Sequence, residues 1–128
     1  MKRLLSILLV VLVLFATTIV LAEDASFTIS NNSTSSWSSA DKAVYSIGTG
    51  FKLSFGTVTN HGVGRGWIDG TSDYATSKYT YNSSYSNTTT SEKDYCTAAN
   101  NGKKKVIWKM RRDSDYSGTF GAKGTFKP

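Results

Sequence analysis

The chain is nearly free of cysteine, proline and, beyond its first 22 residues, leucine. Cys96 is the only cysteine, Pro128 the only proline, and Leu53 the only leucine after position 22. A single cysteine excludes an internal disulfide, so the fold must be held by its core, by a partner, or by a bond between two copies through Cys96. The remaining apolar content is mainly aromatic and β-branched, which favours half-buried strands over helices.

Residues that carry chemistry are also scarce. His61 is the only histidine, and no neighbour in the sequence makes it a metal ligand or a catalytic base. A Cys–His hydrolase would need Cys96, His61 and an orienting group to meet through the fold. We therefore expect no metal, no cofactor and no enzymatic activity, and a hydrolase stays as an alternative. Four aspartates are interpreted as turn residues without the pattern of a calcium loop: Asp69, Asp73, Asp113 and Asp115.

Residues 61–66 form a glycine-rich segment, His-Gly-Val-Gly-Arg-Gly. The segment lacks the G-x-G-x-x-G spacing of a nucleotide-binding loop, and no helical pattern follows to present its N-terminus to a phosphate. We interpret it as a flexible turn. A short strand is expected only just after it, at residues 67–68.

The N-terminus has the pattern of a secretory signal peptide. Three residues with two positive charges precede an 18-residue apolar stretch at 4–21, and polar sequence begins after Ala22. We predict a signal peptide at 1–22, cleavage between Ala22 and Glu23, and a secreted chain that forms one domain at 23–128. The alternative is an uncleaved anchor, because 18 apolar residues nearly span a bilayer. A secreted chain with so little cysteine favours a bacterial source.

Short stretches of alternating apolar and polar residues predict an all-β domain. About seven or eight strands at this spacing indicate an antiparallel β-sandwich or a small barrel. The expected strands are residues 26–30, 44–47, 51–55, 67–68, 78–82, 95–99, 103–112 and 116–126.

The connections between these strands have signals of their own. Asn101-Gly102 predicts a tight hairpin between 95–99 and 103–112. The last strand is expected to close a meander and to be bulged or at an edge, because it contains several glycines. Gly56 is expected to form a bulge that shifts Val58 out of phase. Residues 83–91 are polar and are interpreted as a mobile loop.

Positive charge is concentrated in the last third of the chain. Residues 93–128 carry nine bases and three acids, whereas residues 23–92 carry four bases and six acids. In the strand at 103–112, Val106, Trp108 and Met110 share one face, and the other face carries most of the charge. A row of cations favours an anionic partner, although charged strands also deter edge-to-edge aggregation. The candidate polyanion-binding residues are Lys103, Lys105, Lys109, Arg111 and Arg112.

The aromatic residues allow a second kind of surface. Rings stack on the apolar faces of sugars, so exposed rings would form a sugar platform. A domain with one leucine must also build its core from aromatics, and we favour that interpretation. The rings concerned are Trp37, Trp67, Tyr79, Tyr81, Tyr85, Tyr95 and Tyr116.

Both ends of the chain resemble small exported proteins of Gram-positive bacteria. The resemblance lies in the signal peptide, in Phe27-Thr28-Ile29, and in segments 106–112, 117–119 and 124–128. Those families have no assigned activity, are sometimes encoded near peptide-antibiotic or transporter genes, and provide no functional residue to carry over. The leading hypothesis is a secreted, non-enzymatic binding module that contacts an anionic wall polymer or lipid headgroups, with no specific nucleic acid. The alternative is a bacteriocin-like antibacterial protein or toxin.

Overall fold

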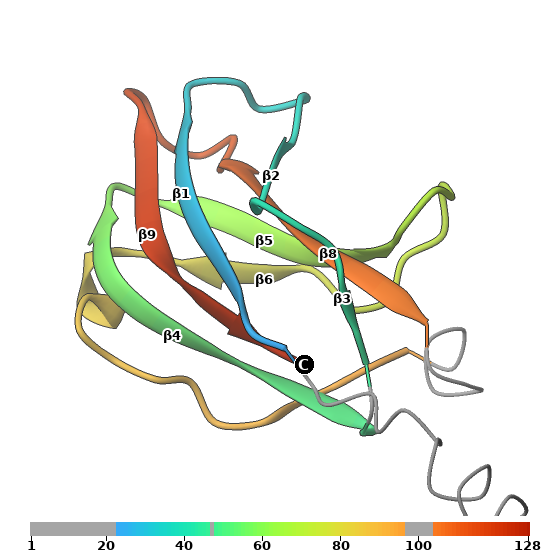
Figure 1. Cartoon of the computed structure of the whole chain (residues 1–128). Coiled ribbons are helices and arrows are strands. Elements are labelled where there is room, and N and C mark those ends of the chain that lie inside the picture. Colours follow the sequence, from blue (N-terminus) through green and yellow to red (C-terminus); the bar gives the residue numbers. More distant parts are fainter. Residues whose placement is uncertain (1–22, 47, 97–103) are drawn as a thin grey trace, which may run out of the picture.

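The computed structural model describes residues 23–46, 48–96 and 104–128. These residues form two antiparallel sheets that pack face to face, which confirms the predicted β-sandwich (Figure 1). No helix in this part of the chain is long and apolar enough to cross a membrane. The elements are β1 (Ala25–Asn31), β2 (Ser38–Ser39), β3 (Val44–Tyr45), β4 (Gly50–Thr59), β5 (Gly62–Ile68), β6 (Tyr79–Tyr81), the 3-10 turn η1 (Ser83–Tyr85), β7 (Lys93–Asp94), β8 (Lys105–Arg112) and β9 (Phe120–Lys127).

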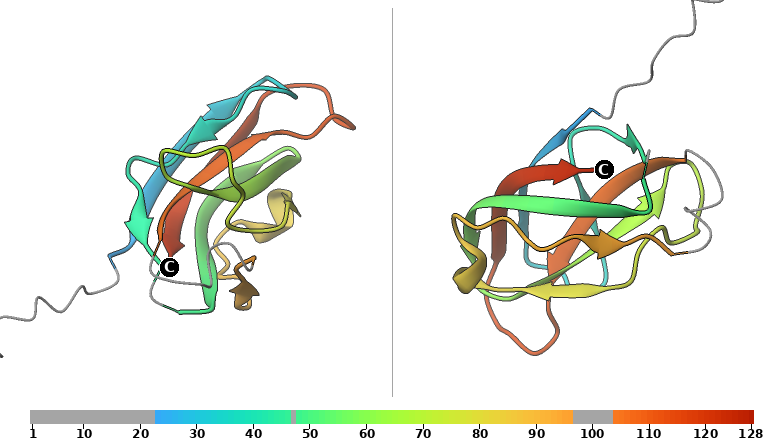
Figure 2. Two further views of the ribbon diagram at one scale, coloured as in Figure 1. Left: turned by 90° about the vertical axis from the view of Figure 1, so that its right-hand side faces the viewer. Right: turned by 90° about the horizontal axis from the view of Figure 1, so that it is seen from below.

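The strand order shows how often the chain crosses between the sheets. One sheet has the order β1-β9-β4-β7, and the other has the order β2-β8-β5-β6, with β3 also pairing with β8. Hereafter these are sheet A and sheet B. Figure 2 shows the two layers from the side and from below, with β4 and β9 in one layer and β5, β6 and β8 in the other. Each sheet therefore has one face toward the shared core and one outer face.

The core lies between the sheets and is largely aromatic. Trp108 of β8 is fully buried, and its ring stacks on that of Phe126 in β9 with 5.7 Å between the centroids. Phe51 of β4 packs 5.6 Å from both of these rings. Burying such a side chain contributes roughly 1.5–3 kcal/mol. Desolvation of the buried Tyr81 hydroxyl also raises the pKa of that phenol well above its usual value.

The glycine-rich segment at 61–66 is not a turn, because most of it forms β5 in the middle of sheet B. Its glycines face the core and leave room for large side chains. A Cβ on Gly62 would lie 2.4 Å from the Phe120 ring, and one on Gly64 would lie 2.3 Å from the Trp108 ring. The prediction failed because glycine in a strand marks a close approach by another segment, and that approach comes from residues far away in the sequence.

The predicted C-terminal meander is also wrong. β9 belongs to sheet A, pairs with β1 and β4, and is therefore an internal strand rather than an edge. Tyr95, at the start of the predicted hairpin, pairs with Thr76 and not with β8, and its ring packs on Phe51. The rest of that segment and its Asn-Gly turn lie outside the described residues. In both places aromatic side chains are buried against residues far away in the sequence, Phe126 against Trp108 and Tyr95 against Phe51.

Two local predictions concern β4. The register with β9 shifts between Phe55 and Val58, and both side chains are buried, which confirms the bulge at Gly56. The polar segment 83–91 is hydrogen-bonded along β4 rather than detached from it. The Ser86 hydroxyl bonds both backbone groups of Val58, and the Thr90 hydroxyl accepts from the Leu53 N–H.

Candidate functional site

The outer face of β8 carries the predicted cations. The burial pattern of β8 alternates, so Val106, Trp108 and Met110 are fully buried, as predicted. Lys105 is exposed and Lys109 and Arg111 are half-buried on the opposite face, together with Ile107. Lys103 and Ala22 lie outside the described residues. Glu23, at the predicted cleavage site, is exposed and pairs with Lys42.

A fourth cation comes from β5, which runs antiparallel beside β8. Arg65 lies directly opposite Lys109, Val63 opposite Arg111, and Trp67 opposite Ile107. Side chains directly opposite each other on neighbouring strands have Cβ atoms about 4.5–5.5 Å apart, and like charges in this position destabilise a sheet. The sequence therefore keeps two positive charges at a position where one alone would be more stable.

Each cation of this group lies over an aromatic ring. Arg65 is 3.8 Å from the centre of the Tyr74 ring, Lys109 is 4.7 Å from Trp67, and Arg111 is 4.9 Å from Trp37. Contacts of this kind stabilise by about 0.5–1 kcal/mol at exposed sites and by more when they are shielded from water. We call these six residues the cationic–aromatic row: Trp37, Arg65, Trp67, Tyr74, Lys109 and Arg111.

The rings of the row also contact one another, with Trp67 in the middle. The Trp67 ring lies 4.5 Å from Tyr74 and 6.1 Å from Trp37, both in edge-to-face arrangements. The row therefore runs across the strands, from the segment before β2 over β8 and β5 to Tyr74. Val63, on the same outer face, is only 2% exposed although it does not belong to the central core cluster. Side chains on this face thus pack over the sheet.

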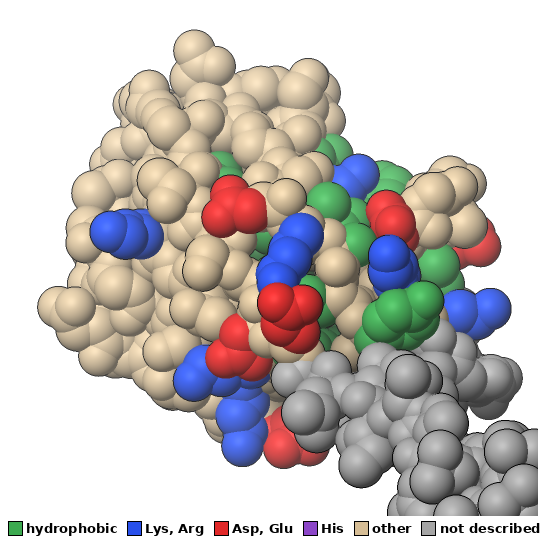
Figure 3. Space-filling model, in the orientation of Figure 1, with side chains coloured by type: hydrophobic (Ala, Val, Ile, Leu, Met, Phe, Trp, Pro, Cys, Tyr) green, Lys and Arg blue, Asp and Glu red, His purple; other side chains and the backbone are tan. Residues whose placement is uncertain are grey.

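The packing leaves three N–H groups of the row buried without a hydrogen bond. They are the Nε atoms of Arg65 and Arg111 and the indole Nε1 of Trp67. In Figure 3, hydrophobic, basic and acidic side chains lie side by side over β2, β3 and β8, whereas the surface over the upper parts of β1 and β9 is mostly neutral and polar. Arg65 and Arg111 remain partly exposed, so their guanidinium groups are held in place but still reach solvent.

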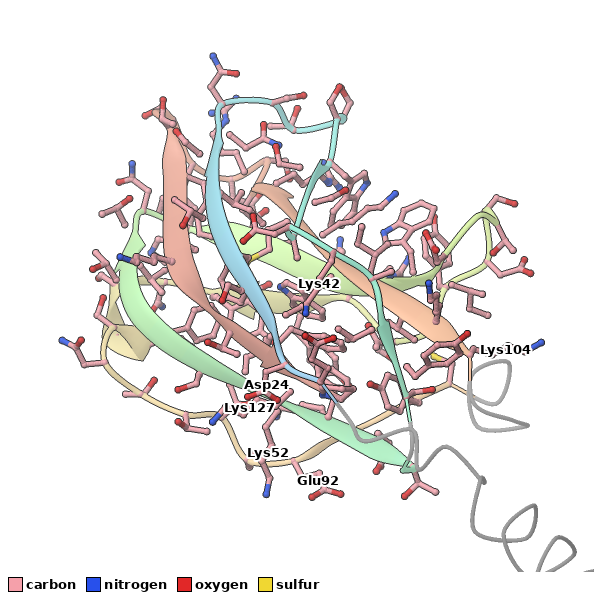
Figure 4. All side chains as sticks on the ribbon, in the orientation of Figure 1. Asp24, Lys42, Lys52, Glu92, Lys104 and Lys127 are labelled. Atoms are coloured by element: carbon pink, nitrogen blue, oxygen red, sulfur yellow. The ribbon has the colours of Figure 1, made fainter. Side chains whose placement is uncertain are left out.

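No carboxylate neutralises the row within the described residues. The two ion pairs found there, Lys42–Glu23 and Lys52–Glu92, lie elsewhere. Figure 4 shows Lys52 beside Glu92 below β4, while Lys104 points away from the ribbon at the start of β8. Among the described residues, the cations of the row therefore contact aromatic rings and form no ion pair.

Two of the predicted cations do not join the row. Lys105 lies at the other end of β8, beyond Ile107, over the exposed ring of Tyr45 at 5.5 Å. Arg112 lies on the same side of β8 as the buried residues, two positions after Met110. Its guanidinium donates to the carbonyls of Asn32 and Tyr116. Arg112 thus holds two loops together, and its proposed contact with a polyanion stays a prediction.

The predicted aromatic platform divides into two groups. Tyr81 and Tyr95 are buried in the core, and Tyr79 and Tyr85 pack against it, in agreement with the interpretation that the core is aromatic. The other three rings lie outside this core. Trp37 and Trp67 belong to the row, and Tyr116 is exposed and stacks on His61 with 3.5 Å between the centroids.

The residues weighed for catalysis have separate surroundings. His61 lies on Tyr116, and its carbonyl accepts from the Asp113 N–H. Cys96 is half-buried beside Ala75, whose carbonyl accepts its N–H. Within residues 23–46, 48–96 and 104–128, no three His, Cys, Asp or Glu side chains are grouped closely enough to hold a metal ion.

Two surface hollows of the described residues lie away from the row. Two shallow hollows, of about 380 and 350 Å³, are lined by residues of β1, β4 and β9 and their neighbours, and by none of the row. The row extends across the strands of sheet B and is not part of either hollow, an arrangement that suits an extended ligand better than a small enclosed one.

Sequence reasoning missed Arg65, Tyr74 and Tyr45. Arg65 was assigned to a turn, and its alternation with Val63 and Trp67 was the available signal for a strand. Tyr74 follows a turn and meets Arg65 only because residues 74–76 fold back along β5. No local pattern encodes that contact.

The chain was also compared with known proteins. No protein-family model, no curated protein and no solved structure matches it.

Proposed function

We propose that this protein is an exported, non-enzymatic binding module that attaches to an anionic polymer through the cationic–aromatic row. The observation that carries the proposal is the placement of Arg65, Lys109 and Arg111 together on two neighbouring strands without a carboxylate partner among the described residues. Like charges directly opposite each other destabilise a sheet, and natural sequences keep such unfavourable pairs mostly at functional sites. A polyanion supplies the missing negative charge.

The position of the row weakens the alternative explanation that these charges prevent aggregation. Charges of that kind protect the open edges of sheets. β8 is an internal strand, since β5 pairs with it along residues 106–112 and β2 and β3 pair with parts of its other side. Most backbone N–H and C=O groups of β8 face paired strands. Its cations therefore do not shield an open sheet edge from another chain.

Open surfaces of this kind attract polyanions by electrostatics and release them as salt is raised. We expect the purified protein to be retained on immobilised dextran sulfate at about 0.1 M salt and to be released at about 1 M. The variant Lys109→Gln/Arg111→Gln should bind about tenfold more weakly, because it loses about 1.4 kcal/mol of binding free energy.

The matched control is Lys123→Gln/Lys127→Gln, which removes the same charge from exposed positions of β9 in sheet A. It should bind within about twofold of the wild type, since its site lies on the other sheet. Thermal unfolding of each variant checks that the fold is kept. Equal weakening in both double variants would show that only net charge matters, and unchanged binding in the β8 variant would refute the proposal.

A further inference from the structure

We infer that the polymer bound by the row is an acidic polysaccharide, whose sugar rings lie on Tyr74 while its anionic groups meet Arg65 and Lys109. This inference rests on the proposed function and specifies its ligand. Its first support is Tyr74, a residue that is 45% exposed although Arg65 lies 3.8 Å and Trp67 4.5 Å from the centre of its ring.

An exposed but fixed aromatic ring has a particular use. The contacts with Arg65 and Trp67 restrict the Tyr74 side chain before any ligand arrives, so little conformational entropy remains to be lost on binding. A tyrosine ring is an apolar plate with a hydroxyl at its rim. Such a surface matches a sugar, which presents C–H groups on the face of its ring and hydroxyls around it.

The distribution of charge places the anionic groups next to that plate. Arg65 lies against the Tyr74 ring and directly opposite Lys109, and Arg111 follows two residues along β8, about 6.6 Å further. Asp69 and Asp73 flank the segment that leads to Tyr74 and are exposed, so negative groups of a ligand are favoured on the β8 side of the ring. A chain that alternates rings with anionic groups fits this order across the strands.

A membrane surface fits the row less well. Proteins that lie in the interface of a bilayer insert Trp, Phe or Leu side chains into it. The large exposed hydrophobic residues of the described chain are three tyrosines, Tyr45, Tyr74 and Tyr116. Trp37 and Trp67 are half-buried and pack edge-to-face on each other, so neither projects from the sheet.

The test compares two polyanions, one with sugar rings and one without. Binding of dextran sulfate and of inorganic polyphosphate is measured for the wild type and for Tyr74→Leu at about 0.1 M salt. Any loss of support for Arg65 affects both polymers equally, so the ratio of the two affinities isolates the contact with the sugar. We expect Tyr74→Leu to bind dextran sulfate about tenfold more weakly, in line with stacking on a single ring, and polyphosphate within about twofold.

Tyr116→Leu is the matched control, because Tyr116 is equally exposed, at 43%, and stacks on His61 away from the row. It should change neither affinity. Equal loss of both polymers in Tyr74→Leu would overturn the inference and leave the proposed function standing. Tighter binding of the wild type to phosphatidylglycerol vesicles or to single-stranded DNA than to dextran sulfate would also overturn it. If the wild type binds neither polymer, the proposed function itself fails.

Discussion

At the scale of single residues, the glycines of β5 explain how so many rings fit into a small sandwich. Gly62, Gly64 and Gly66 point toward the core, where Phe120, Trp108 and Thr76 occupy the space that side chains would otherwise fill. The same strand presents Arg65 and Trp67 outward. One seven-residue segment thus provides both the space for the core and part of the proposed binding surface.

The substitution Gly64→Ala tests this arrangement. Its Cβ would lie 2.3 Å from the buried Trp108 ring, so the indole or the strand must move. Overpacking of this kind costs about 1–3 kcal/mol, which urea unfolding measures. Gly48→Ala is the control, because Gly48 is exposed and its nearest neighbours would be 3.9 Å away. If both variants unfold at the same urea concentration, β5 does not pack on Trp108 as described.

Whether a residue faces in or out could be predicted from the sequence wherever the neighbours alternate. The inward face of β8 was predicted correctly, because hydrophobicity with a period of two is a local property. The glycine strand was not recognised, since the reason for its glycines is a tryptophan 44 positions further along the chain.

At the scale of elements, pairing between strands creates the row. β8 contributes Lys109 and Arg111, β5 contributes Arg65 and Trp67, and the other two rings come from segments beside β2 and β5. The outward position of the β8 cations could be predicted from the alternation of apolar and charged residues along that strand. Their partners were not, because the strand order of sheet B depends on which aromatic faces pack against sheet A.

The contact between Lys109 and Trp67 should appear as a coupling across the two strands. A double-mutant cycle with Lys109→Gln and Trp67→Leu, followed by urea unfolding, should give an interaction free energy of about 0.5–1 kcal/mol. Pairing Trp67→Leu with Lys123→Gln, which lies in β9 of sheet A, should give a value near zero. A cycle without coupling for the first pair would mean that the ring does not hold the lysine.

At the scale of the whole molecule, the two outer faces differ in chemistry. The outward positions of β1 and β9 in sheet A are mostly small hydroxyl residues, glycines and lysines, whereas sheet B carries the row. The aromatic core joins the two sheets, with Trp108 and Phe126 stacked between them. A rigid sandwich of this kind holds the cations in fixed positions, as the proposed binding of a polymer to one face requires.

The three tryptophans report directly on the face that a polymer uses. Trp37 and Trp67 belong to the row, whereas Trp108 projects from the opposite face of β8 and is fully buried. In a titration of the isotope-labelled protein with dextran sulfate, nuclear magnetic resonance should show the indole N–H signals of Trp37 and Trp67 moving while that of Trp108 stays in place. Saturable binding that leaves the Trp37 and Trp67 signals unmoved would contradict the central claim that the row is the binding surface.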